Sequence, residues 1–268
     1  MDEQLYHAVL RNLVEKVRDL LKDKPGLDVN GKDHDHRTAL HNASSYSHHE
    51  IVRLLLAHPT INVNLQTSDG YTPFSLCCYS GSVSMVRVLL KDPRVDIILP
   101  DDENGCSPLW WASFMGQHEV VEWLIASGRD LGDLDTTGRD WDGKEFSAIE
   151  IARDRRRSKV VSLLERFKVD PTQTRHEICV KLGVLDELAA ELFALVVFLC
   201  DDLLQLKPAP TTSLDARRFF TITAALPMEL QMLLCHYVSG TGKQNIMLND
   251  SEAAFCSLAR ILVLSQSK

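Results

Sequence analysis

Four segments of the chain repeat one pattern, and this repetition constrains the fold more than any other feature. Each segment opens with Thr or Ser, runs through a short apolar stretch and is followed by a second apolar stretch. The four openings lie 34, 35 and 40 residues apart: Thr38–His41, Thr72–Ser75, Ser107–Trp110 and Ser147–Glu150. The second stretches cover residues 50–56, 84–90, 119–125 and 159–164. A period of this length predicts similar units that stack side by side around a continuous core.

The pattern of each unit is typical of two consecutive helices. The opening Thr or Ser can accept a backbone N–H as an N-cap, and Pro73 and Pro108 occupy a first helical position where no donor is lost. Small residues then let neighbouring helices approach closely; these are Ala43, Cys77, Cys78 and Ala112. The β-branched segments 61–64 and 95–98 suit the arms of short hairpins.

The pattern resembles the ankyrin repeat, whose family motif joins a T-P-L-H-x-A helix, a G-H turn, an E-V-V-x-L-L helix and a D-V-N hairpin. Residues 5–21 align with 40–56 at an offset of 35 and are more polar, as a capping repeat should be. The resemblance implies an all-α ankyrin-repeat solenoid with short β-hairpin tips and about five repeats over residues 1–168. The repeats are expected at 1–35, 36–69, 70–104, 105–144 (with an insertion) and 145–168.

Two regions depart from the repeat. The polar stretch 129–146 is expected to form an extended hairpin or loop. Residues 169–268 are expected to form a C-terminal helical domain that packs on the last repeat and covers its apolar face. Its predicted helices cover 174–182, 185–206, 215–226, 228–238 and 251–264, and the second of them, apolar nearly all round, should be central and buried.

One C-terminal segment, residues 226–238, resembles the opening of an F-box, whose family pattern is L-P-x-E-L followed by spaced apolar residues. The matching positions are Leu226, Pro227, Glu229 and Leu230. A poxviral family joins ankyrin repeats to such a segment and recruits cullin–RING ubiquitin ligases through an adaptor subunit. The match covers about 13 residues, and Pro and Glu suit the first turn of any helix, so a plain structural helix remains the alternative.

Composition narrows the classes of partner. A net charge of −8 argues against nucleic acid as the main partner, because no basic excess exists to displace counterions. The apolar run 192–200 is far shorter than a membrane-spanning helix, and the N-terminus lacks the features of a secretory signal. Seven cysteines without C-x-x-C spacing are expected to be reduced thiols. We therefore expect an intracellular monomer, cytoplasmic or nuclear, with no membrane contact.

No cofactor, metal site or catalytic centre is expected. The segment 240–243 lacks the first Gly and the Ser or Thr of a phosphate loop, and 133–144 lacks the final Glu of a calcium loop. Five histidines between 34 and 49 have no cysteines at zinc spacing, and His41 occupies the family's T-P-L-H position, where it is expected to order the turns. The basic run 153–159 is expected to be a solvated face or an ionic contact with the acidic C-terminal helices, with an anion site as the alternative.

The ankyrin resemblance implies a concave groove lined by exposed positions of the first helices and by the hairpin tips. The helix positions are Asn42, Ser45, Tyr46, Leu76, Tyr79, Ser80, Trp111, Phe114 and Met115, and the tip positions are His36, Arg37, Asp69, Tyr71, Asn104 and Cys106. Tyr46, Tyr79 and Phe114 are expected to form an aromatic ladder of the kind that protein interfaces favour. Packing of Trp111 and Phe114 against the insertion or a neighbouring repeat is the alternative.

The sequence thus predicts a non-enzymatic adaptor that binds a protein partner through the concave face. The alternative function is a substrate receptor of a cullin–RING ubiquitin ligase, in which the same face holds the substrate and residues 226–238 dock the ligase.

Overall fold

A computed structural model describes residues 2–24, 26–200 and 228–239, with the single residues 223, 226 and 254. The chain divides into two compact units, Met1–Arg175 and His176–Lys268, and each is described by itself.

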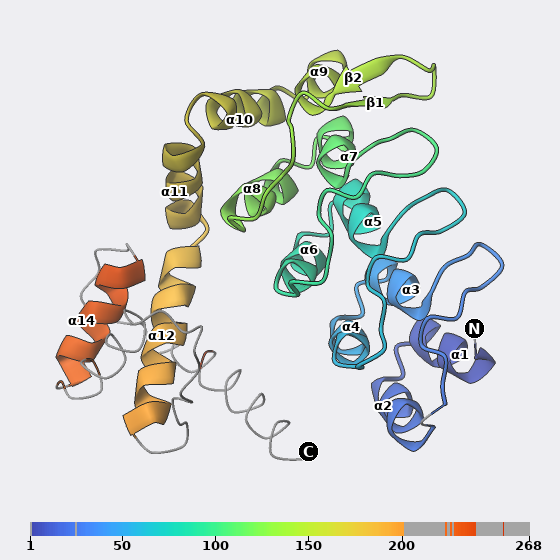
Figure 1. Cartoon of the computed structure of the whole chain (residues 1–268), viewed down its shortest axis with the longest axis horizontal. Coiled ribbons are helices and arrows are strands. Elements are labelled where there is room, and N and C mark those ends of the chain that lie inside the picture. Colours follow the sequence, from blue (N-terminus) through green and yellow to red (C-terminus); the bar gives the residue numbers. More distant parts are fainter. Residues whose placement is uncertain are drawn as a thin grey trace, which may run out of the picture. The chain divides into compact units, whose positions relative to one another are not determined.

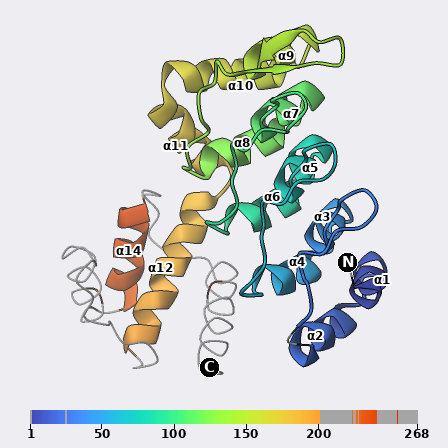
Figure 2. The ribbon, with the colours of Figure 1, turned by 45° about the vertical axis from the view of Figure 1, so that its right-hand side comes forward.

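The first unit is a stack of five helix pairs. The first helices of the pairs are α1 (Glu3–Leu10), α3 (Ala39–Ser45), α5 (Pro73–Ser80), α7 (Pro108–Met115) and α9 (Ala148–Asp154). The second helices are α2 (Val14–Asp23), α4 (His49–Leu56), α6 (Val83–Leu90), α8 (His118–Ala126) and α10 (Ser158–Val169). First helices contact first helices and second helices contact second helices, so two parallel rows form, with long loops on the side of the first helices (Figures 1 and 2). The predicted all-α solenoid is confirmed.

The repeated Thr and Ser residues start the first helices as the sequence predicts. Each side-chain oxygen accepts the backbone N–H three residues later; the caps are Thr38, Thr72, Ser107 and Ser147. In α3, α5 and α9 the third residue bonds back to the N-cap backbone, which completes a capping box. Proline stands in the first turn of α5 and α7, where the backbone N–H that proline lacks would have no partner within the helix.

The fourth motif position links two of the repeats to the repeat that follows. The ring of His41 lies with Nδ1 3.1 Å from the backbone nitrogen of Thr38 and with Nε2 3.0 Å from the carbonyl oxygen of Tyr71. Nδ1 therefore accepts the Thr38 N–H, and Nε2 carries the proton that is donated to the Tyr71 carbonyl. Trp110 occupies the equivalent position two repeats later, and its Nε1–H donates to the carbonyl of Phe146 at 2.8 Å. Both carbonyls immediately precede the next N-cap, so an indole performs the same bridging task as the imidazole.

The expected hairpin arms at 61–64 and 95–98 are not strands, and this prediction is wrong. Asparagine side chains satisfy their backbone instead. The Asn30 amide donates to the carbonyl of Thr60 at 2.8 Å and accepts the backbone N–H of Asn62 at 2.8 Å. Asn64 forms the same two bonds, both at 2.8 Å, with Arg94 and Asp96 in the next repeat. Because each loop is bonded to its neighbour through a side chain, no strand ladder is needed.

The insertion 129–146 does form the expected extended hairpin. Strands β1 (Thr137–Arg139) and β2 (Glu145–Ser147) pair antiparallel, with Gly138 opposite Phe146. Gly138 lies against Cys106, because a Cβ at this position would come within 2.6 Å of the Cys106 sulfur. Together with the bond from Trp110, this contact fixes the hairpin along the N-terminal end of α7 (Figure 1).

Replacing Gly70 by alanine is expected to lower the free energy of unfolding by about 3 kcal/mol. Gly70 has φ +79°, and its new Cβ would lie 2.3 Å from the backbone nitrogen of Asp102 in the next loop. Gly105 is a matched control, because its φ is +69° but nothing lies within 4 Å of an added Cβ. Gly105→Ala should lose only about 1 kcal/mol. Urea denaturation of the two variants measures the difference, and equal losses would contradict the close contact between loops.

The described part of the second unit is helical. Helix α11 (Pro171–Lys181) spans the division between the units, and α12 (Val184–Cys200) packs on α14 (Met228–Ser239) through Phe193, Val196 and Cys235. The predicted helices 215–226 and 251–264 lie outside the described residues, apart from three single positions. Among the described helices, none has the length and apolar character that crossing a bilayer requires.

Candidate functional site

The surface of interest is the inner face, which we define as the exposed side of α3, α5, α7 and α9 together with the loops that precede them. It presents the predicted binding residues in three different environments. Exposed positions are Ser45, Tyr46, Asp69 and Ser80, and half-buried positions are Leu76, Tyr71, Tyr79 and Met115. Buried positions are Asn42, Cys106, Trp111 and Phe114. Three of the predicted helix positions therefore have side chains that no partner can reach in this structure.

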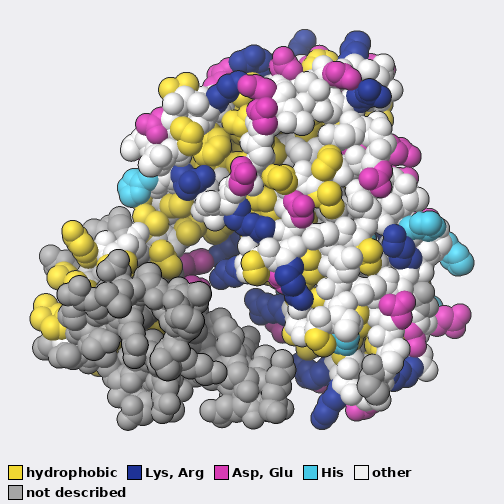
Figure 3. All heavy atoms as spheres, viewed as in Figure 1, with side chains coloured by type: hydrophobic (Ala, Val, Ile, Leu, Met, Phe, Trp, Pro, Cys, Tyr) yellow, Lys and Arg dark blue, Asp and Glu magenta, His cyan; other side chains and the backbone are white. Residues whose placement is uncertain are grey.

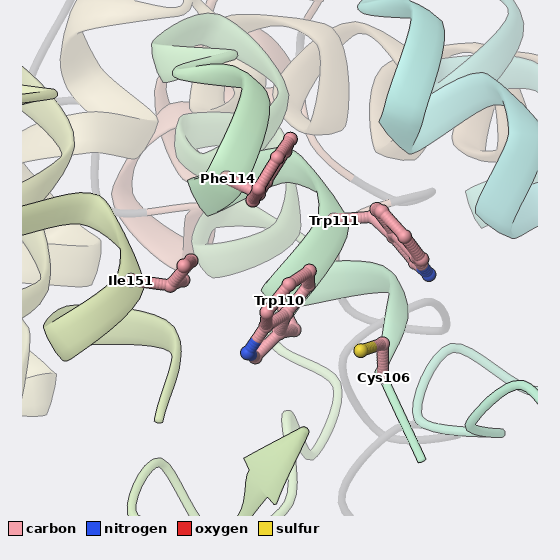
Figure 4. Packing of buried hydrophobic residues seen from close by; sticks show 5 residues of the cluster. All are labelled: Cys106, Trp110, Trp111, Phe114 and Ile151. Atoms are coloured by element: carbon pink, nitrogen blue, oxygen red, sulfur yellow. The ribbon is translucent and has the colours of Figure 1, made fainter. Parts of the chain in front are cut away.

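Trp111 and Phe114 are part of the core rather than of the surface (Figure 4). Trp111 is 2% exposed, and its ring centre lies 5.5 Å from that of Tyr79. Its indole N–H donates to a carboxylate oxygen of Asp101 at 2.9 Å. Trp111 and Phe114 therefore pack inside the protein, which is the alternative that the sequence left open for these two rings.

The insertion supplies the ring that covers this core. Trp141, at the hairpin tip, stands perpendicular to Phe114 with ring centres 4.8 Å apart and lies 6.3 Å from Trp111. Trp141 itself is 67% exposed. The sequence analysis missed it, although a tryptophan in an otherwise polar insertion is a recognisable signal for a surface contact.

The expected aromatic ladder does not form. Tyr46 is the C-cap of α3, one residue beyond the position that Tyr79 and Phe114 occupy in their helices. Ser45 is their counterpart. Tyr46 instead stacks on His48, with ring centres 5.8 Å apart. The aromatic surface is therefore confined to the repeats next to the insertion.

A cleft of about 490 Å³ opens beside this aromatic surface, between two loop tips and the insertion hairpin. Its walls include Asp69, Tyr71, Glu103, Arg139, Asp140 and Trp141. Burial, followed by the negative charge of Asp101, raises the pKa of Tyr71 to about 12, so its hydroxyl stays neutral near pH 7. The cleft combines aromatic rings with carboxylates and contains a single arginine.

The basic run 153–159 is largely committed to contacts within the first unit. Arg155 lies 3.5 Å from Asp140, with its guanidinium 4.8 Å from the ring centre of Phe114. Arg157 donates to the carbonyl of Phe114 at 3.2 Å, and Arg153 pairs with Glu165. These contacts tie the run to the end of the stack, while Arg153, Arg156, Arg157 and Lys159 are exposed, as expected of a solvated face.

Two of the buried thiols are held in the neutral form. Burial raises the pKa of the Cys77 thiol to about 12 and that of Cys235 to about 11, so both remain protonated. In the part of the chain that the structure describes, no group of three or more His, Cys, Asp or Glu side chains is placed to hold a metal ion.

The F-box-like segment is only partly described. Leu226 is half-buried and Leu230 is 46% exposed, whereas Pro227 lies outside the described residues, and the side chain of Glu229 does too. Helix α14 also exposes Met228, Leu233, Tyr237 and Val238.

Comparison with known proteins places the repeats in a family. A family model for ankyrin repeats, in three copies, matches residues 5–101 and 61–135. The human protein "Transient receptor potential cation channel subfamily A member 1" is 30% identical over 128 residues, 48% of this chain and 11% of that protein. The yeast (Saccharomyces cerevisiae) "Probable 26S proteasome regulatory subunit p28" is 34% identical over 130 residues, 47% of this chain and 56% of that protein.

Human inversin is 32% identical over 154 residues, 56% of this chain and 14% of that protein. The chain therefore spans little more than half of p28 and a much smaller share of the other two relatives. The capping boxes, the paired rows of helices and the inter-repeat bond of His41 agree with the family match over residues 5–135. The chain is an ankyrin-repeat protein.

Proposed function

We propose that the chain binds a protein partner through the inner face of its ankyrin stack, where Met115, Tyr79 and Trp141 surround the buried rings. One observation carries the proposal: Trp141 is a large apolar side chain, 67% exposed, and is held in place by Phe114 and Trp111. A ring that is already fixed loses little entropy on binding, and Trp, Tyr and Met are enriched at protein interfaces.

The residues around the apolar patch formed by Tyr79, Met115 and Trp141 resemble the rim of an interface. Ser80 and Asp69 are exposed, and Tyr71 is half-buried against the same core. Interfaces of moderate affinity combine a small apolar centre with such a polar border. The ankyrin-repeat relatives are consistent with a role in protein–protein interaction.

The double substitution Met115→Ala/Trp141→Ala is expected to weaken partner binding by roughly 30-fold or more, because two central contacts are removed. Affinity capture with the full chain, quantified protein by protein, measures the loss. Trp123→Ala is the matched control. This tryptophan lies on α8 in the other row and contacts Arg87 at 4.3 Å, so its loss should leave capture unchanged. Identical capture by the double variant and the wild type would exclude the inner face.

A second candidate function concerns α14. Its exposed Met228, Leu230, Leu233 and Tyr237 support a docking helix, and the F-box-like resemblance points to a cullin adaptor as its partner. A pull-down with that adaptor should succeed with the wild type and fail with Leu226→Ala/Pro227→Ala/Leu230→Ala. Absence of any wild-type binding would end this reading and leave binding by the inner face untouched.

A further inference from the structure

The cleft beside the aromatic patch carries negative charge that the chain itself does not neutralise. Asp140, 6% exposed, accepts the backbone N–H groups of Asp142 and Lys144, both at 3.0 Å, and lies 3.5 Å from Arg155. Arg139, the cation in the wall, pairs with Glu145 at 3.3 Å. The charges of Asp140 and Arg139 are therefore neutralised by contacts within the chain.

Asp69 and Glu103 are different. They come from successive loop tips, both are exposed, and neither has an ion pair or a side-chain hydrogen bond with any described residue. Two carboxylates thus face the cleft without a counter-charge. Figure 3 shows acidic side chains along the edge where the loop tips lie, interspersed with Lys, Arg and His side chains. The local field at the cleft favours a cation.

The aromatic walls narrow the kind of cation. Trp141 presents a ring that is 67% exposed, and Tyr71 lies half-buried with its ring centre 5.4 Å from that of Trp111. An arginine guanidinium can stack flat on such a ring and at the same time donate paired hydrogen bonds to a carboxylate. A lysine ammonium cannot do both, because it is a strongly hydrated point charge. A bound metal ion would need three or more ligating groups gathered together, which the described residues lack.

We propose that this cleft receives an arginine side chain of the bound polypeptide, with the guanidinium stacked on Trp141 and paired with Asp69 and Glu103. The inference rests on the proposed binding role of the inner face and names the chemistry of the partner. The arginine is an anchor at the edge of the apolar patch formed by Tyr79, Met115 and Trp141. The site thus selects segments in which a basic residue adjoins apolar ones.

The experiment selects binders from a display library of random 12-residue peptides against the full chain. The enriched peptides are synthesised and measured by fluorescence anisotropy. We expect arginine at one fixed position, and replacing it by citrulline, a neutral side chain of the same shape, should weaken binding at least 10-fold, the order expected for a charge-assisted pair. Lysine at that position should also bind more weakly than arginine.

The chain variant Asp69→Asn/Glu103→Gln tests the carboxylates. Both side chains are exposed and unpaired within the described structure, so the fold should not change. Against this variant, arginine and citrulline peptides should differ by less than about 2-fold, because the partner of the charge is gone. Glu3→Gln/Glu119→Gln is the matched control. It removes the same charge from exposed sites on α1 and α8 and should preserve the 10-fold difference.

Three results would overturn the arginine site. They are peptides without a fixed arginine, equal binding of arginine and lysine peptides, and no enrichment at all. Peptides that ignore Asp69→Asn/Glu103→Gln but are lost with Met115→Ala/Trp141→Ala would refute the arginine site and leave the proposed function standing. Peptides that bind regardless of both changes would refute both.

Discussion

Replacing Trp111 by alanine is expected to lower the free energy of unfolding by about 4 kcal/mol. The ring is 2% exposed and contacts Tyr79 and Phe114, with ring centres 5.5 and 5.9 Å away. Its removal leaves a cavity, and the carboxylate of Asp101, which is 5% exposed, loses the indole N–H bond at 2.9 Å and keeps the bond from the Asn104 backbone N–H. Urea denaturation of the full chain, followed by far-UV circular dichroism, measures the loss.

Two companion variants separate the contributions. Trp111→Phe keeps most of the ring volume but removes the indole N–H bond to Asp101, so it should lose roughly 2 kcal/mol. Trp141→Ala removes an equally large but 67% exposed ring and should lose about 1 kcal/mol. If Trp111→Ala lost less than about 1 kcal/mol, the ring would not be part of the core, and Trp111 would return to the set of residues available to a partner.

The rows of helices could be predicted because their signals are local. Thr72, Pro73 and Ser75 specify a helix start within four residues, and the same spacing recurs in each repeat. The bridging role of His41 could likewise be predicted from its motif position. The equivalent role of Trp110 could not be predicted, because the motif contains no tryptophan. Its acceptor, the carbonyl of Phe146, is also 36 residues away in the sequence.

The exposure of the inner face could not be predicted, because it depends on contacts distant in sequence. Helical position alone places Trp111 on the open side of α7, and only the folded insertion, through Trp141, shows that this side is covered. The cleft has the same origin, since Asp69 and Glu103 come from different tips and meet the insertion only in three dimensions. Repetition therefore predicts the scaffold, while the insertion that breaks it determines the surface.

Acidification from pH 7 to 4.5 is expected to lower the free energy of unfolding by about 2.5 kcal/mol through His41 alone. Burial of the ring lowers the pKa of His41 to about 4, although the bond to the Tyr71 carbonyl opposes the shift. In the unfolded chain the pKa is near 6.5. Between these values the unfolded state binds more protons, so the stabilisation is complete above pH 6.5 and is lost as the pH falls towards 4.

The comparison that isolates this residue is His41→Gln, measured by urea denaturation at several pH values between 7 and 4.5. The glutamine variant is expected to be less stable than the wild type at pH 7, but it has no titrating ring at position 41. The carboxylates with a lowered pKa, such as Asp92 and Glu150, titrate alike in both proteins, so the difference between the two pH profiles reports His41. Parallel profiles would mean that the ring is not held neutral. Protonation places a second N–H opposite the Thr38 amide, so two donors face each other at the N-terminus of α3, while Nε2 keeps its proton for the Tyr71 carbonyl.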